Sequence, residues 1–267
     1  MKPEENKFAD VPVRVRTWVY IIVVFAIGIY NPLATKILIS WITFQCFFEF
    51  SRMFKIESNQ LIPSIFICVL QFLILYFLDK ETYFISSLIL TFIIILYFLF
   101  LKVQTNQLKG IFVSLIVCLF SFPHLVFIRE MTTGIQLVIF AVVVTELNDV
   151  FQYLMGKFFG KHKIVPKISP NKTLEGFIGG SLLTILLSNI LGLLLLNSNI
   201  LTNTILGIIL GISGFCGDIL MSYLKRRTNV KDTGDLLPGH GGLLDRMDSL
   251  IFNAPIFFWI LPFILKN

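Results

Sequence analysis

Long runs of apolar residues recur along almost the whole chain, and they constrain its fold more than any other feature. A helix that crosses a membrane needs about 20 largely apolar residues. There are about nine such runs, roughly at residues 17–30, 33–50, 61–78, 84–101, 111–128, 135–155, 176–196, 200–224 and 249–265. Only 14% of the 267 residues are charged, whereas a water-soluble domain has about 25%. The sequence therefore predicts an all-α, polytopic integral membrane protein with about nine transmembrane helices.

The positive charges predict how these helices are oriented. Segments that would share a side with the N-terminus contain 18 of the 22 Lys and Arg residues, and the other side contains 4. Because the cytoplasmic loops of membrane proteins are enriched in Lys and Arg, we expect a cytoplasmic N-terminus and an external C-terminus. The same distribution accounts for the formal net charge of +6 without a nucleic-acid partner.

The two halves of the chain differ in composition, although no linker or repeat separates them. Residues 1–130 consist mainly of hydrophobic helices, whereas residues 140–250 bring acids, glycines and lysines into and between the helices. A charged acid at the bilayer centre costs about 2.5–3.5 kcal/mol, so several of them indicate partners or a function. We therefore predict one membrane domain, residues 1–267, with a catalytic half at 140–250 that contains two cytoplasmic loops.

Groups of opposite charge lie on one helical face near the C-terminal end of the run at 200–224. Asp218, Ser222 and Lys225 share a helical face because they are spaced by four and three residues, and Arg226 borders that face. The carboxylate would lie about two turns deeper than the cations. This pattern is suited to a metal ion held deep and phosphates bound near the surface, with a structural ion pair as the alternative interpretation.

The segment that follows is rich in glycine and acids. Glycines on both sides of His240 allow the backbone to approach a ligand closely. Asp245 and Asp248 are three residues apart at the start of the last helix. Carboxylates in that arrangement can bind a hard divalent cation together with Asp218.

Two blocks of this half resemble a known family, the phosphatidate cytidylyltransferases, also called CDP-diacylglycerol synthases. The first block spans 27 residues and contains Ser222, Lys225, Arg226, Lys231, Asp232, Pro238, His240 with its glycines, Asp245, Arg246 and Asp248. The second contains Asn148, Asp149, Lys167, Ser169, Lys172, Thr173 and Glu175, and it is similar to the other catalytic loop of the family. The chain departs from the usual family pattern at Gln152, Asn171 and Leu174.

The resemblance implies an enzyme that transfers a cytidylyl group from CTP to phosphatidate and releases pyrophosphate. It implies Mg²⁺ as cofactor and leaves a second cation open. The acceptor is dissolved in the membrane and CTP in the cytosol, so we expect the active site to face the cytoplasm. The expected location is the inner membrane of a bacterium. Family members suggest a homodimer, with which the glycine-rich helices are compatible.

The resemblance also assigns roles to residues. Asp218, Asp245 and Asp248 are the expected Mg²⁺ ligands, with Asp149 in support. Together with these, the expected catalytic residues are Lys225, Arg226, Lys231, Asp232, His240 and Arg246. The expected substrate-binding residues are Asn148, Asp149, Lys167, Ser169, Lys172, Thr173, Glu175 and Ser222.

Two other functions fit parts of the sequence. A CTP-dependent lipid kinase, or a cytidylyltransferase for another lipid phosphate, would need a similar site; neither a P-loop nor a dinucleotide-binding glycine motif is present. Acids within membrane helices also occur along the ion pathways of transporters. A transporter is favoured less, because the polar residues gather on one side of the predicted membrane.

Overall fold

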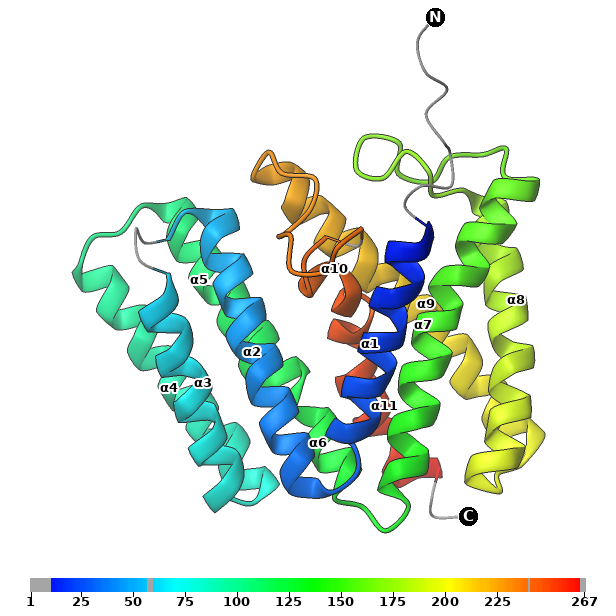
Figure 1. The fold of residues 1–267 in the computed structure, drawn as a ribbon, viewed down its shortest axis with the longest axis horizontal. Coiled ribbons are helices and arrows are strands. Elements are labelled where there is room, and N and C mark those ends of the chain that lie inside the picture. The colour runs from blue at the N-terminus through cyan, green and yellow to red at the C-terminus, as the bar shows by residue number, and fades with distance from the viewer. Residues whose placement is uncertain (1–10, 57–59, 240, 265–267) are drawn as a thin grey trace, which may run out of the picture.

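The computed structural model describes residues 11–56, 60–239 and 241–264. Within these residues the regular structure is helical, apart from two isolated β-bridges in loops. The helices are α1 (Val11–Gly28), α2 (Pro32–Phe54), α3 (Leu61–Phe77), α4 (Lys80–Phe100), α5 (Thr105–Ile116), η1 (Val117–Ser121), α6 (Pro123–Arg129), α7 (Gly134–Phe159), α8 (Leu174–Leu191), η2 (Gly192–Leu196), α9 (Ile200–Arg227), α10 (Leu244–Met247) and α11 (Leu250–Ile264). They run roughly alongside one another in a broad bundle (Figure 1).

Each predicted apolar run corresponds to one helix or to one continuous helical segment. In the described part of the chain, seven segments are long and apolar enough to cross a membrane. Three of them combine shorter elements: Thr105–Arg129, Leu174–Leu196 and Leu244–Ile264. Two shorter apolar helices, Arg16–Gly28 and Leu61–Phe77, bring the number of apolar helical segments to the nine predicted. The all-α, polytopic membrane fold is therefore confirmed.

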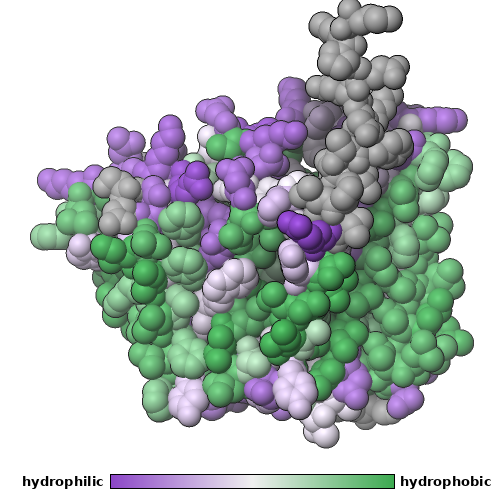
Figure 2. All heavy atoms as spheres, viewed as in Figure 1, coloured by the Kyte–Doolittle hydropathy of each residue, from purple (hydrophilic) through white to green (hydrophobic). Residues whose placement is uncertain are grey.

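The surface is divided as a membrane protein requires. On the face seen in Figure 2, a broad apolar belt lies between two polar edges. Helix α4 faces outward along most of its length, since only 17% of its most apolar window is buried. Its large exposed side chains include Phe92 and Tyr97, which are 63% and 57% exposed. Such a surface is stable only against lipid or another protein.

Short polar side chains begin the helices and allow tight turns between them. The side chains of Asn31, Thr173 and Asn199 accept hydrogen bonds from backbone N–H groups in the first turns of α2, α8 and α9. Such caps satisfy amide groups that have no partner within the helix. Helices can consequently reverse direction within a few residues at the membrane edge.

The two loops predicted to carry the chemistry lie at the same end of the bundle, which we call the loop end (Figure 1). One loop joins α7 to α8 and the other joins α9 to α10. The C-terminal ends of α2, α7 and α9 are also at this end, and the turns after α1 and α6 are at the opposite end. The polar edge of the bundle is thicker at the loop end (Figure 2).

Glycines hold α7, α8 and α9 close together. A Cβ atom at Gly180 of α8 would lie 2.5 Å from Cγ of Gln152 in α7 and 2.7 Å from its backbone N and Cα atoms. A Cβ atom at Gly207 of α9 would lie 2.8 Å from the Cα atom of Ile185 in α8. Small residues permit this close approach of backbones within a membrane. The loops at the ends of these helices are thereby placed on a rigid support.

Candidate active site

The face of α9 predicted from the sequence is present, and it meets the first loop. Lys172, at the end of the α7–α8 loop, forms an ion pair with Oδ2 of Asp218. Ser222 donates a hydrogen bond to Oδ1 of Asp218 over 3.3 Å. The structure thus brings together Lys172 and Asp218, two residues that are 46 positions apart in the sequence. The ammonium group of Lys172 also lies 5.5 Å from the ring centre of Phe215.

The environment of Lys172 favours its charged form. Burial alone would lower the pKa of this lysine, but the carboxylates of Asp218 and Asp149 outweigh burial and raise the pKa above its usual value. A cation is therefore held at the meeting point of the two loops. Its main partner is a carboxylate of a membrane helix.

Three acids form a cluster that we call the acidic centre: Asp149 of α7, Asp218 of α9 and Asp248 between α10 and α11. Asp149 and Asp248 each experience the charge of Asp218, and Asp248 also experiences the charge of Asp149. Ser249 donates a hydrogen bond to Oδ2 of Asp149 over 2.7 Å. The other oxygen of Asp149 is buried and has no hydrogen-bond partner in the described structure. A buried carboxylate oxygen without a hydrogen-bond partner is energetically costly unless a bound ligand interacts with it.

Asp245 has a different environment from the acidic centre. Its Oδ1 atom pairs with the ammonium of Lys225 over 2.7 Å. Its Oδ2 atom accepts hydrogen bonds from the backbone N atoms of Thr233 and Gly242 over 2.8 and 3.0 Å. Both oxygens are occupied by protein donors. Asp245 consequently fixes the α9–α10 loop to the end of α9.

A second carboxylate holds this loop from beneath. Glu49 of α2 is 1% exposed. Its oxygens accept hydrogen bonds from the backbone N atoms of Leu243 and Leu244 over 2.8 and 2.9 Å and from the Thr233 hydroxyl over 2.7 Å. A Cβ atom at Gly242 would lie 2.4 Å from Glu49, so glycine is required there. These partners lie 184 to 195 positions away in the sequence, so they could not be identified before the fold was known.

The α7–α8 loop is shaped by residues expected to bind substrate. Glu175 accepts hydrogen bonds from the backbone N atoms of Lys161 and His162 over 2.8 and 3.1 Å, and it pairs with the His162 ring. Thr173 caps α8. Asn148 is buried between helices, where it accepts the hydroxyl of Thr184 over 2.8 Å. The structure places these three predicted residues where they support the loop and the helices beneath it.

The remaining predicted residues lie on the two loops around the acidic centre and at the ends of the helices that carry them, a region that we call the rim. Arg226 links the loops by donating to the carbonyls of Ile168 and Val230 over 3.3 and 3.1 Å. Arg246 acts electrostatically on Asp149. The other rim residues are exposed or partly exposed on the two loops: Lys167, Ser169, Lys231 and Asp232. His240 lies outside the described residues.

The comparison with known proteins identifies this arrangement. Residues 12–264 match the model of the cytidylyltransferase family. The chain belongs to the cytidylyltransferase family. It is therefore a nucleotidyltransferase, and its two polar loops coincide with the blocks that resemble the family signature.

Relatives of this cytidylyltransferase are found in several bacteria. It is 38% identical to the uncharacterized protein YnbB of Escherichia coli, over 97% of this chain and 90% of that protein. It is 36% identical to a phosphatidate cytidylyltransferase of Staphylococcus epidermidis, over 62% of this chain and 65% of that protein. The corresponding enzyme of Staphylococcus aureus is 37% identical over 64% and 66%. The staphylococcal matches thus cover just under two thirds of those proteins.

The carboxylates of this cytidylyltransferase differ in how well they suit a metal ion. Within the residues described, no three His, Cys, Asp or Glu side chains are arranged to hold a metal ion as they stand. Asp245 is held more tightly than Asp218: its Oδ1 pairs with Lys225 and its Oδ2 accepts two backbone N–H groups, whereas the oxygens of Asp218 meet Lys172 and one long 3.3 Å hydrogen bond from Ser222. The acidic centre fits it better, because Asp149 has a buried oxygen with no partner and hard cations prefer carboxylate oxygens. Lys172 is the cation that now balances Asp218.

Proposed function

We propose that this enzyme transfers the cytidylyl group of CTP to phosphatidate and so forms CDP-diacylglycerol and pyrophosphate. The observation that carries the proposal is the pairing of Lys172 with Asp218, which joins the α7–α8 loop to the acidic centre on α9. Family membership supports a cytidylyl transfer, and the printed names of the staphylococcal relatives support phosphatidate as acceptor.

The reaction needs cations and no side-chain nucleophile. An oxygen of the lipid phosphate attacks the α-phosphorus of CTP, and the bond from that phosphorus to the bridging oxygen of the β-phosphate breaks. The leaving pyrophosphate carries the electron pair away. Both reactants are polyanions, so their approach requires positive charge. Lys172, Lys225 and Arg246 surround the acidic centre, and the more exposed Lys231 and Arg226 complete a positive rim.

We propose that Mg²⁺ is held by Asp149, Asp218 and Asp248 rather than by a set that includes Asp245. When bound, the ion would neutralise charge on the reacting phosphates. Lys172 then serves as a phosphate ligand, because substrate phosphates offer it a competing anion to Asp218. Asp245 and Glu49 act as positioning residues for the α9–α10 loop, which contains Lys231. Asp245 also holds Lys225 at the end of α9.

The location follows from the same proposal. The loop end would face the cytoplasm of a bacterium, where CTP is dissolved, and the apolar belt would lie in the inner membrane. The 18 Lys and Arg residues assigned to this side support the orientation. The lipid acceptor would reach the acidic centre from the membrane and the nucleotide from the water.

The proposed reaction is tested with the purified enzyme in lipid nanodiscs. It should be supplied with CTP, Mg²⁺ and, separately, phosphatidate, an isoprenoid phosphate or diacylglycerol. We expect pyrophosphate release when phosphatidate is the lipid supplied and none with the other two lipids. Asp218→Asn serves as the inactive control. Release of CDP with diacylglycerol would instead identify a lipid kinase. Pyrophosphate release only with the isoprenoid phosphate would show that this lipid, and not phosphatidate, is the acceptor.

A further inference from the structure

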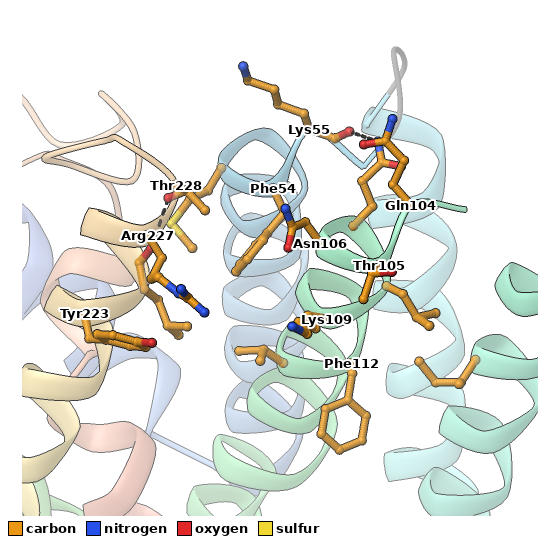
Figure 3. A pocket seen from close by; sticks show the side chains of 16 residues that line it. Phe54, Lys55, Gln104, Thr105, Asn106, Lys109, Phe112, Tyr223, Arg227 and Thr228 are labelled. Carbon is orange, nitrogen blue, oxygen red and sulfur yellow. Dashed lines mark hydrogen bonds between the residues drawn. The ribbon is translucent and has the colours of Figure 1, made fainter. Parts of the chain in front are cut away.

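A second polar region at the loop end has no part in the proposed reaction. A cavity of about 1000 Å³ lies between the C-terminal ends of α2 and α9 and the start of α5. Two cationic side chains lie beside it in Figure 3, Lys109 from α5 and Arg227 from the end of α9, and Lys55 at the end of α2 also lines it but points its side chain upward and away. None of the residues that line it was predicted to belong to the active site.

In the described part of the chain, the cations of this cavity have no acidic partner. Among residues 11–56, 60–239 and 241–264, no Asp or Glu lines the cavity. Among the described residues, none of the four ion pairs involves Lys55, Lys109 or Arg227. Arg227 instead lies over the ring of Tyr223, 5.6 Å from its centre. The two positive charges that flank this opening, Lys109 and Arg227, would attract an anion.

A side-chain hydrogen bond and close helix packing fix the position of the cavity. Gln107 of α5 donates a hydrogen bond to the carbonyl of Lys55 over 2.5 Å, which ties the start of α5 to the end of α2. Gly110 lets α5 pack against Phe54, since a Cβ atom there would lie 2.3 Å from the phenyl ring. The cavity is thus enclosed by packed helices on the α2–α5 side. On the opposite side it is bounded by Tyr223 and Arg227.

The walls become apolar with depth. Phe112 lies one turn of α5 below Lys109, on the side away from the loop end (Figure 3). It is 51% exposed, and Tyr223 across the cavity is 40% exposed. Ile95 and Val113 also line the cavity. A ligand that fills this space needs a negatively charged head at the level of the cations and a hydrocarbon portion below it.

The cavity and the acidic centre lie on opposite faces of α9. Arg227 follows Asp218 by nine residues, which at 100° per residue is half a turn away. Lys225 follows Asp218 by seven residues and therefore stays on the face of Asp218. Occupancy of the cavity can consequently change without a contact to Asp218 or its partners.

We propose that this cavity binds an anionic glycerophospholipid, with its phosphate between Lys109 and Arg227 and its acyl chain against Phe112. A soluble nucleotide would leave the apolar lower walls without a partner. A lipid places its phosphate at the cations and its acyl chain against the apolar walls. The proposal defines a lipid site separate from the one at which phosphatidate would react. It does not depend on the reaction assigned to the acidic centre.

Native mass spectrometry of the detergent-purified protein tests this site. The probe is an equimolar mixture of phosphatidylglycerol and phosphatidylcholine, and the readout is the amount of each lipid retained. The parent should retain phosphatidylglycerol preferentially. Lys109→Gln/Arg227→Gln should weaken that retention about ten- to a hundred-fold, the range of a lost charge-assisted contact. Asn106→Trp should reduce it too, because the indole would fill the cavity without changing its charge.

Matched controls separate this site from general surface charge. Lys157→Gln/Lys163→Gln removes two exposed cations at the loop end outside the cavity and should leave retention unchanged. All variants should keep the melting temperature of the parent. Equal loss of lipid in the control, or unchanged retention in both cavity variants, would overturn the proposal. Displacement of the lipid from the parent by CTP would also overturn it, because the cavity would then be a nucleotide site.

Discussion

Asp218 of α9 is bound by Lys172 of the α7–α8 loop and by Ser222 one turn further along its own helix, so its substitution affects the contact between α9 and that loop. Asp218→Asn should reduce turnover at least about 100-fold, because loss of a charged ligand to a reacting group commonly costs more than one hydrogen bond. The protein should remain folded, since the change preserves the size of the side chain. Pyrophosphate release and thermal melting measure the two effects.

A double variant separates a catalytic role from a structural ion pair. If the pair only stabilises the fold, Lys172→Gln/Asp218→Asn should regain activity, because no charge is then left unpaired. If both residues act on the substrates, as we propose, the double variant should be as inactive as Asp218→Asn. Recovered turnover would therefore contradict the proposed site.

The carboxylates should differ in their effect on the Mg²⁺ requirement. Asp149→Asn should raise the Mg²⁺ concentration needed for half-maximal activity, because Asp149 has a buried oxygen with no partner. Lys231→Ala should weaken apparent CTP affinity about ten- to a hundred-fold and leave the Mg²⁺ requirement unchanged. The measurement is a Mg²⁺ titration at several CTP concentrations. Identical Mg²⁺ curves for Asp149→Asn and the parent would show that the metal is held elsewhere.

Glu49 can be tested apart from catalysis. Glu49→Gln removes the charge that accepts the N–H groups of Leu243 and Leu244, and it should destabilise the protein by about 1–3 kcal/mol. Glu130→Gln is the matched control, because its pair with Lys36 is partly exposed and should contribute at most about 1 kcal/mol. Thermal unfolding in detergent measures both. Equal effects of the two variants would show that Glu49 does not hold the loop.

Only some of the contacts between site residues could be predicted from the sequence. The match of two blocks to one family predicted that both loops serve one site, and Lys172 does contact Asp218. Spacing alone placed Asp245 with Asp248 on one face of a helix. The structure instead has only the short helix α10, Leu244–Met247, before α11 starts at Leu250. Asp245 therefore joins the loop, whereas Asp248 is beside Asp149.

At the scale of the helices, the glycines of α7–α9 set the spacing beneath the site. Gly180→Ala should destabilise the protein by about 1–3 kcal/mol, since its Cβ atom would collide with backbone atoms of Gln152. Gly211→Ala on α9 is the control, because its Cβ atom would have ordinary contacts of 3.5 Å or more. That change should be neutral or stabilise the helix by up to about 1 kcal/mol. Thermal melting that ranks the two variants in the opposite order would contradict this packing.

Helix number was predictable because length and hydropathy decide whether a segment can cross a membrane. The ends were less predictable: the run expected at 111–128 is part of a segment from Thr105 to Arg129. Polar residues such as Gln107 and Lys109 extend that helix beyond its apolar part and line the cavity at the loop end. Pairings such as Glu49 with the α9–α10 loop join residues nearly 200 positions apart, and no local pattern reports them.

For the whole molecule, the proposed orientation can be tested by labelling. Cysteines at Lys163→Cys and Thr132→Cys lie at opposite ends of the bundle, in the loops after α7 and α6. A thiol reagent that cannot cross the membrane should label position 132 in intact spheroplasts and position 163 only in inside-out vesicles. Labelling of both positions from one side would contradict the fold. The reverse pattern would keep the fold and invert the proposed orientation.

The fate of the individual phosphates of CTP tests the central proposal most directly. The purified enzyme would be incubated with phosphatidate and with CTP labelled at either the α- or the γ-phosphate. Cytidylyl transfer predicts that the α-label enters the lipid and that the γ-label appears in soluble pyrophosphate. A lipid that acquires the γ-label, or one that acquires neither label while the enzyme is folded, would contradict the proposed reaction.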